Sequence, residues 1–137
     1  MRRLRGRLKE GGATKLLGFR LEEMKKGRAA LRMDVDHRHK QLHGVVHGGV
    51  LAALADSAAA IAAYTVLRPG VELATVEMKI NFLEAIVDGH ARAVGRVLRA
   101  GRNFVVTECE IRTRKGRLAA KALLTFGAAS GKSLRET

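Results

Sequence analysis

The sequence is poor in cysteine and in aromatic residues, which stabilise the cores of many small proteins through disulfides and large buried side chains. Among its 137 residues there is one cysteine, no tryptophan and only 4% aromatic residues. The single cysteine, Cys109, cannot form an internal disulfide, which indicates a reducing compartment and excludes a cysteine-rich zinc module. The core must therefore be built from Val, Leu, Ile and Ala, and the length and the hydrophobic content of 47% suit one domain.

Long apolar runs and acidic residues are also scarce. No run approaches the length of a membrane span, and the basic start MRRLRGRLKE lacks the apolar segment of a secretory signal, so we expect a cytoplasmic protein. The net charge is +13, from 26 Lys+Arg against 13 Asp+Glu, which suits an anionic partner or a solubilising surface equally. No aromatic residues are interleaved with the basic ones, so nucleic acid is not the expected partner.

Periodicity predicts two strands, one long helix and four further strands. Residues 16–24 and 28–36 read as a hairpin. The alanine-rich stretch from Gly48 to Leu67 favours helix, and the RPG at 68–70 should end it. Apolar alternation predicts further strands in ATVEMKINF, HARAVGRVL, NFVVTECEIRT and RLAAKALLTF, with Val76, Met78, Ile80 and Phe82 on one face of the first.

One helix among six strands predicts an α+β fold in which a curved antiparallel sheet wraps a single central helix. The alanines of the helix would let the strands approach closely. We expect a basic arm at 1–14, formed as a short helix or a mobile segment, one domain at 15–127 and a flexible tail at 128–137.

The segment HGVVHGGVLAALAD, residues 43–56, places one carboxylate, Asp56, on an apolar helix that starts with glycines. The polar loop before it contains several histidines, but HRHKQLH lacks the carboxylate or cysteine partners of a stable metal site. We therefore expect neither a metal nor another cofactor.

HGGVLAALAD, followed by TVEMKINFLEAI and GRNFVVTECEIRTRKGRLAAKALLTF, resembles the hotdog-fold acyl-CoA thioesterases, and most closely their PaaI-like, phenylacetate-pathway branch. The resemblance spans about residues 16–126. It implies a thioester hydrolase whose helix begins at HGG and whose Gly48 N–H polarises the thioester carbonyl. The first N–H groups of a helix lack intrahelical acceptors and lie at its positive end, which supports such an oxyanion site independently.

The resemblance gives Asp56 the role of general base for water or of nucleophile. Its apolar neighbours Leu54, Ala55 and Ala58 would raise its pKa and basicity, and the short side chain favours a positioned water. A surface Asp is the structural alternative.

The other residues around HGG receive supporting roles by the same resemblance. Gln41 corresponds to an amide that bonds the carbonyl or the water, with a solvated loop residue as the alternative. His47 and Gly49 are expected beside the substrate, His47 as a helix-start residue and not as a base. Many family members carry a Ser or Thr one turn after the carboxylate, where this chain has Ala60. Cys109 is expected to be a small core residue.

The nucleotide of coenzyme A needs surface cations, and family members supply them near strand turns. Arg99 and Arg102 fit that place best, with Arg114 and Lys115 as weaker candidates.

Gly48 and Asp56 are eight residues apart, roughly 12 Å along a helix, so one helix cannot bring both to one carbonyl. The geometry and the resemblance together predict a homo-oligomer, a dimer with shared sites that associates further into a tetramer. A non-catalytic hotdog protein that binds acyl-CoA or another anionic partner is the alternative function, and a dehydratase ranks last.

Overall fold

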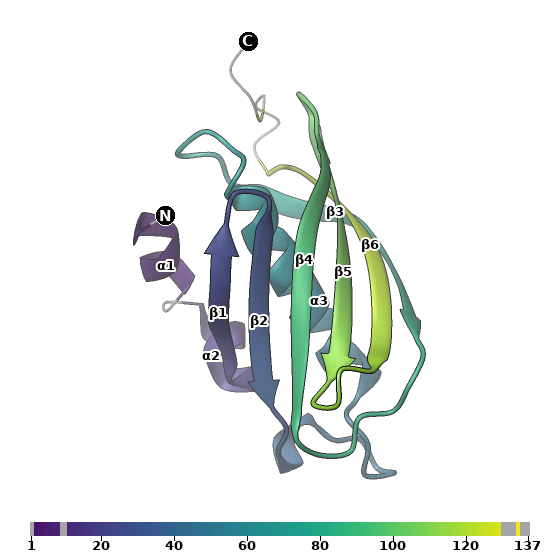
Figure 1. The fold of residues 1–137 in the computed structure, drawn as a ribbon. Coiled ribbons are helices and arrows are strands. Elements are labelled where there is room, and N and C mark those ends of the chain that lie inside the picture. Colours follow the sequence, from purple (N-terminus) through teal and green to yellow (C-terminus); the bar gives the residue numbers. More distant parts are fainter. Residues whose placement is uncertain (1, 9–10, 130–133, 135–137) are drawn as a thin grey trace.

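A computed structural model describes residues 2–8, 11–129 and 134, and it shows a six-stranded antiparallel sheet that curves around one long helix (Figure 1). The long helix is α3, Gly48–Tyr64. The strands occur in the order β1-β2-β4-β5-β6-β3, with bounds β1 Phe19–Lys25, β2 Arg28–Asp34, β3 Leu73–Phe82, β4 His90–Ala100, β5 Phe104–Thr113 and β6 Leu118–Ala128. The predicted α+β hotdog architecture is confirmed.

Small side chains let α3 lie directly on the sheet. A Cβ atom added to Gly95 of β4 would stand 2.7 Å from the backbone carbon and oxygen of Ala58, and 2.8 Å from the Cα atom of Ala59. Both alanines are fully buried, as are Ala91 and Ala93 on the same face of β4. This confirms the expectation that the alanines permit close approach, and it fixes the position of α3 across the middle of the sheet.

The predicted face of β3 is wrong at one position because the strand contains a bulge. The pairing of β3 with β6 shifts register between Thr75 and Glu77. Val76 therefore turns to the outer face of the sheet, where its Cγ2 atom lies 3.3 Å from where a Cβ atom of Gly127 would be. Thr75 takes the place on the inner face, toward α3. One extra residue in a strand is enough to reverse which side chains face the core.

The first strand begins later than the sequence suggests. Two helices precede it, α1 at Arg2–Leu8 and α2 at Gly12–Leu17, so Leu16 and Leu17 are helical and not part of the hairpin. Gly18 ends α2 in the left-handed region, with φ of 73°, and its N–H bonds to carbonyls of the last turn. The β1–β2 hairpin itself is confirmed.

The long helix also ends earlier than predicted, at Tyr64 and not at Leu67. The hydroxyl of Thr65 accepts a hydrogen bond from Gly27 N–H at 2.7 Å and donates to the Ala62 carbonyl at 2.6 Å, which ties the helix end to the β1–β2 turn. The helix stops where this side chain offers the backbone other partners.

The predicted division into arm, domain and tail stays a prediction, because α2 spans the first boundary and residues 130–133 and 135–137 lie outside the described residues. Among the helices of the described ranges, none is long and apolar enough to cross a membrane.

The contact at Gly95 can be tested by overpacking. Gly95→Ala should destabilise the fold by about 1–3 kcal/mol, because the added methyl group meets helix backbone that cannot move aside. Gly12→Ala is a matched control, since no atom lies within 4 Å of a Cβ atom there. Urea unfolding at one protein concentration measures both. Equal stability of the two variants would contradict the close approach.

Candidate functional site

The N-terminus of α3 is capped by the side chain that precedes it. His47 is the N-cap residue, and its Nδ1 atom accepts the N–H of Gly49 at 2.8 Å, while its carbonyl accepts the N–H of Val50. His47 is thus placed as a helix-start residue, as expected. The N–H of Gly49 is already hydrogen-bonded within the chain, to His47. The N–H of Gly48 belongs to the first turn and has no intrahelical acceptor, so it is the donor that remains for a ligand.

An aromatic ring from β3 stands beside this donor. The Cζ atom of Phe82 lies 3.2 Å from where a Cβ atom of Gly48 would be. Glycine lets this ring lie close against the helix start, since a Cβ atom here would make the ring shift by a few tenths of an ångström. The ring is still 52% exposed, so it forms an apolar wall beside the Gly48 N–H.

Asp56 lies in the third turn of α3 and meets a different part of β3. Its Oδ1 atom accepts a hydrogen bond from the hydroxyl of Thr75 at 2.7 Å. The neighbours Leu54, Ala55 and Ala58 are fully buried, whereas Asp56 itself is half-buried. The carboxylate is therefore fixed through one oxygen and open through the other.

Sequence reasoning missed Thr75. The resemblance predicts a hydroxyl one helical turn after Asp56, where this chain has Ala60. In the structure the hydroxyl comes instead from Thr75 on the facing strand β3. The bulge at Val76 turns Thr75 inward. The sequence carries no signal of this, because the apolar alternation from Val76 onward places Thr75 on the opposite, outer face.

Gln41 lies in the turn before α3. Its Oε1 atom accepts the N–H of His43 at 2.7 Å, and Gly44, with φ of 80°, closes the same turn. The side-chain carbonyl of Gln41 therefore accepts a hydrogen bond within its own turn, and its NH₂ group can donate to a ligand.

The histidines before α3 do not gather around a common point. The buried His39 accepts the N–H of Asp36 through Nδ1, and its Nε2 atom lies 2.7 Å from the carbonyl of Leu17, so both ring nitrogens have backbone partners. His39 is therefore a core residue that joins α2 to this loop. Across the described ranges, no group of three or more His, Cys, Asp or Glu residues could hold a metal ion.

Cys109 is fully buried on the inner face of β5. Burial raises the pKa of its thiol to about 12, so the thiolate does not form near neutral pH. Its expected role as a core residue is confirmed.

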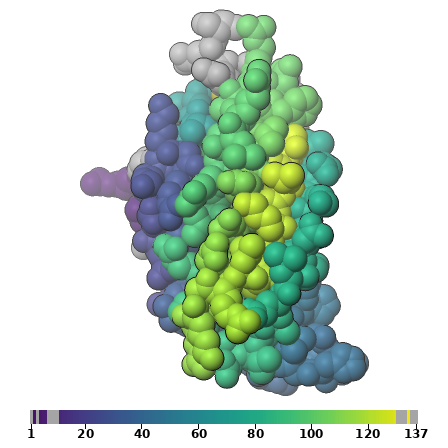
Figure 2. Space-filling model, turned by 45° about the vertical axis from the view of Figure 1, so that its right-hand side comes forward, coloured from purple at the N-terminus to yellow at the C-terminus, as the bar shows by residue number. Residues whose placement is uncertain are grey.

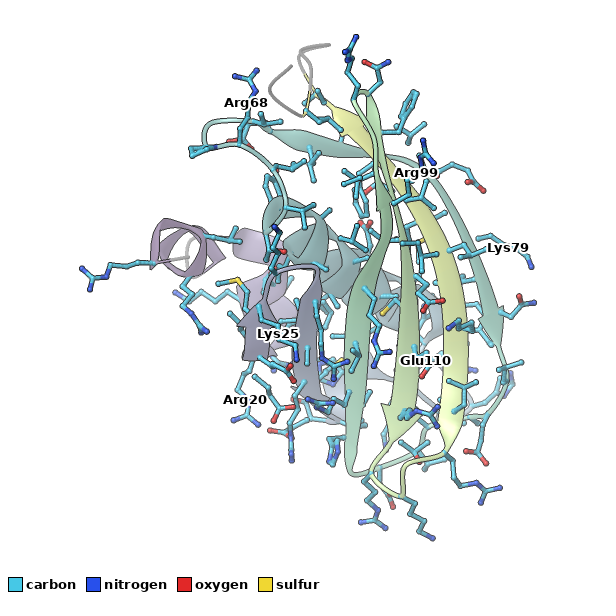
Figure 3. The ribbon with its side chains drawn as sticks, turned by 45° about the horizontal axis from the view of Figure 1, so that its top comes forward. Arg20, Lys25, Arg68, Lys79, Arg99 and Glu110 are labelled. Atoms are coloured by element: carbon cyan, nitrogen blue, oxygen red, sulfur yellow. The ribbon has the colours of Figure 1, made fainter. Side chains whose placement is uncertain are left out.

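Arg99 and Arg102, the two cations that fit best by sequence, lie far from Gly48 within one chain. Arg99 pairs with Val106 after a bulge in β4, which directs it to the outer face of the sheet near the β4–β5 turn that contains Arg102 (Figure 3). That turn is at the opposite end of the sheet from the loop that enters α3 (Figure 1). Arg114 and Lys115, in the β5–β6 turn, lie at the same end as that loop, and Arg114 is 3.6 Å from Asp88.

Two candidate half-sites therefore lie along one helix. Gly48 and Phe82 form one of them, and Asp56 and Thr75 form the other. Gln41 lies in the turn before the helix. Eight residues of helix, roughly 12 Å, separate the two half-sites.

Comparison with known proteins places this geometry in a family. Residues 43–120 match the family model described as the thioesterase superfamily. A protein of Saccharolobus solfataricus with a provisional esterase name is 35% identical over 109 residues, covering 80% of this chain and 77% of its own length. The 1,4-dihydroxy-2-naphthoyl-CoA hydrolase of Escherichia coli is 31% identical over 116 residues, 85% of each chain.

Solved structures agree on the fold. A thioesterase from Haemophilus influenzae has a TM-score of 0.83 and 30% identity, covering 88% of this chain and 85% of its own. The PaaI protein from the phenylacetic acid degradation operon of E. coli has a TM-score of 0.85 over 93% of this chain and 91% of its own. At 24% identity the PaaI likeness shows the shared fold alone.

Proposed function

The chain belongs to the thioesterase superfamily, a family of thioester hydrolases, and from that premise we propose that it hydrolyses the thioester of a coenzyme A-linked acyl or aryl-acyl group. The observation that carries the proposal is the half-buried carboxylate of Asp56, held on the Thr75 hydroxyl in the middle of α3. The name of the E. coli relative supports coenzyme A as the thiol carrier. The exposed Phe82 ring beside Gly48 offers an apolar wall for the acyl or aryl group.

The residues divide the reaction between a base and an oxyanion site. Asp56 takes a proton from a water molecule, whose oxygen attacks the thioester carbonyl carbon. The negative charge that develops on the carbonyl oxygen is stabilised by the Gly48 N–H and the Gln41 NH₂ group. When the tetrahedral intermediate collapses, the carbon–sulfur bond breaks, and Asp56 returns the proton to the sulfur that leaves. Thr75 holds the carboxylate so that its free oxygen meets the water.

The Asp56 carboxylate and the Gly48 N–H must both come within about 3 Å of the thioester carbonyl or its attacking water, and one chain cannot achieve this. We propose that Gly48 and Gln41 of one chain act with Asp56 of a second chain. A two-fold axis would then create two composite sites per dimer. His47 supports the donor end by capping its helix.

The edge of the sheet supports this pairing. β3 is a ten-residue edge strand that runs along one side of the molecule (Figure 2). Val76 and Phe82 of this strand, and Leu83 directly after it, are each more than half exposed. Such an edge favours pairing with another strand. Antiparallel pairing of two β3 strands near their middle would place Thr75 of one chain beside the partner's Phe82. It would bring Asp56 near the partner's Gly48, because Thr75 contacts Asp56 and Phe82 contacts Gly48. Further association of such dimers into a tetramer stays a prediction.

The same two-fold arrangement gives Arg99 and Arg102 a role. Within one chain these residues lie at the opposite end of the sheet from Gly48 (Figure 1). In an antiparallel pair, that end lies alongside the partner's Gly48. We propose that the two arginines bind the coenzyme A phosphates of the partner's site, with Arg102 nearer because Arg99 points to the outer face.

The central prediction concerns the base. Asp56→Asn should lower kcat/KM for an acyl-CoA by about 10² to 10⁴-fold, because the amide cannot accept the proton of the water. Asp34→Asn, an exposed carboxylate on β2, is the matched control and should retain activity. Circular dichroism checks the fold of both. Near-normal turnover by purified Asp56→Asn would exclude this mechanism.

The Thr75 hydroxyl should have a smaller effect. Thr75→Val keeps the shape but removes the hydrogen bond to Asp56, and kcat should fall roughly tenfold, the equivalent of about 1.4 kcal/mol. Thr125→Val, on the outer face of the neighbouring strand, is the control. Steady-state kinetics measure both variants. If the two behave alike, Thr75 does not position the base.

The phosphate contacts can be separated from the chemistry. The double change Arg99→Ala, Arg102→Ala should raise KM for an acyl-CoA and barely change turnover of the matching acyl-pantetheine, which lacks the nucleotide. Arg114→Ala with Lys115→Ala tests the weaker pair in the same assay. Equal losses on both substrates would show that Arg99 and Arg102 act through folding or the acyl site.

A further inference from the structure

A cavity of about 500 Å³ lies on the other flank of α3, away from Asp56. Its walls come from α1, α2, β1, β2 and α3. Asp56 contacts β3, whereas this cavity is lined by β1, and these two strands form opposite edges of the sheet. Figure 3 shows Arg20 of β1 and Lys79 of β3 on opposite sides of the molecule. Within one chain the cavity is thus separate from both half-sites.

The floor of the cavity consists of core side chains. Leu31 of β2 is 1% exposed and Ile61 of α3 is 3% exposed, yet both line the cavity. Phe19 and Leu21 of β1 continue this apolar surface. The cavity therefore reaches from the surface to the hydrophobic core, along the line where α2 covers the edge of the sheet.

The rim is positively charged. Arg5 of α1, Lys15 of α2 and Arg20 of β1 line it, and all three are exposed residues. The guanidinium of Arg20 is paired with Asp34 at 2.8 Å. Within residues 2–8, 11–129 and 134, no ion pair is formed by Arg5 or Lys15, which leaves two cations available to a ligand.

We propose that this cavity binds a free carboxylic acid with an apolar tail. The tail would lie against Leu31 and Ile61, and the carboxylate would lie between Arg5 and Lys15. A ligand without charge would leave both cations unused, and a small inorganic anion would leave the apolar floor uncovered. The volume falls in the range of about 300–1,000 Å³ that is typical of small-molecule sites. Thioester hydrolysis releases acids of this class, but binding here requires no turnover and goes beyond the proposed function.

Calorimetry with dodecanoate, below its micelle concentration, tests the proposal on the full chain. Wild-type protein and Asp56→Asn should bind it equally, because the cavity does not involve Asp56. The double change Arg5→Ala, Lys15→Ala should weaken binding by at least about tenfold, since two charge-assisted contacts are lost. The double change Arg2→Ala, Lys26→Ala removes the same charge from exposed positions outside the cavity and should leave the affinity unchanged.

Two further measurements separate this site from its alternatives. Leu21→Trp should fill the cavity and abolish binding, and its unfolding transition reports whether the fold is retained. Saturating coenzyme A should not displace dodecanoate. Equal affinities of the two double variants, equal binding of dodecan-1-ol and dodecanoate, or displacement by coenzyme A would each overturn the proposal. Failure of the proposed function would instead appear as full activity of Asp56→Asn, which leaves these binding results unaffected.

Discussion

The contact on which the structure most depends is that between α3 and the sheet at Gly95. At this point helix backbone lies where a side chain of β4 would otherwise be. A helix of alanines buries little apolar surface per residue, so its stability depends on close approach and on dense packing. Because α3 is fixed at Ala58 and Ala59, its two ends and its central carboxylate are fixed as well. The proposed donor at Gly48 and the proposed base at Asp56 are therefore held at a set separation, and that separation is too long for one site.

The edge strand β3 relates these two distant groups. Its end packs Phe82 on the helix start, and its beginning offers the Thr75 hydroxyl to Asp56. A bulge of one residue at Val76 makes the second contact possible. Bulges are common beside active sites because they redirect a side chain without breaking the sheet. The same strand is exposed on its outer edge, so the element that orients both half-sites is also the one suited to join two chains.

Much of the fold could be predicted from the sequence, because its periodicity is strong. The alanine-rich helix, the hairpin and the apolar alternation after Pro69 identify one helix and six strands, and HGG marks where the helix starts. The position of Thr75 could not be predicted, since alternation alone places Val76 on the inner face and the bulge depends on pairing with β6. The burial of His39 could not be predicted either. Its ring bonds to the backbone N–H of Asp36 and the backbone carbonyl of Leu17, and any residue can supply such groups. Local pattern determines the elements, whereas tertiary pairing determines which side chains meet.

The central claim is that each site is shared between two chains, and complementation tests it most directly. One chain carries Asp56→Asn; the other carries Gln41→Ala with Gly48→Pro, which removes the donor N–H at a helix position that tolerates proline. Each variant alone, folded and dimeric, should be nearly inactive. Co-expression with two affinity tags isolates the heterodimer, in which one site carries both lesions and the other is wild-type. The account predicts about half of the wild-type activity per heterodimer. A pure heterodimer that stays as inactive as its parents, or a wild-type protein that is active as a monomer, would contradict the shared site.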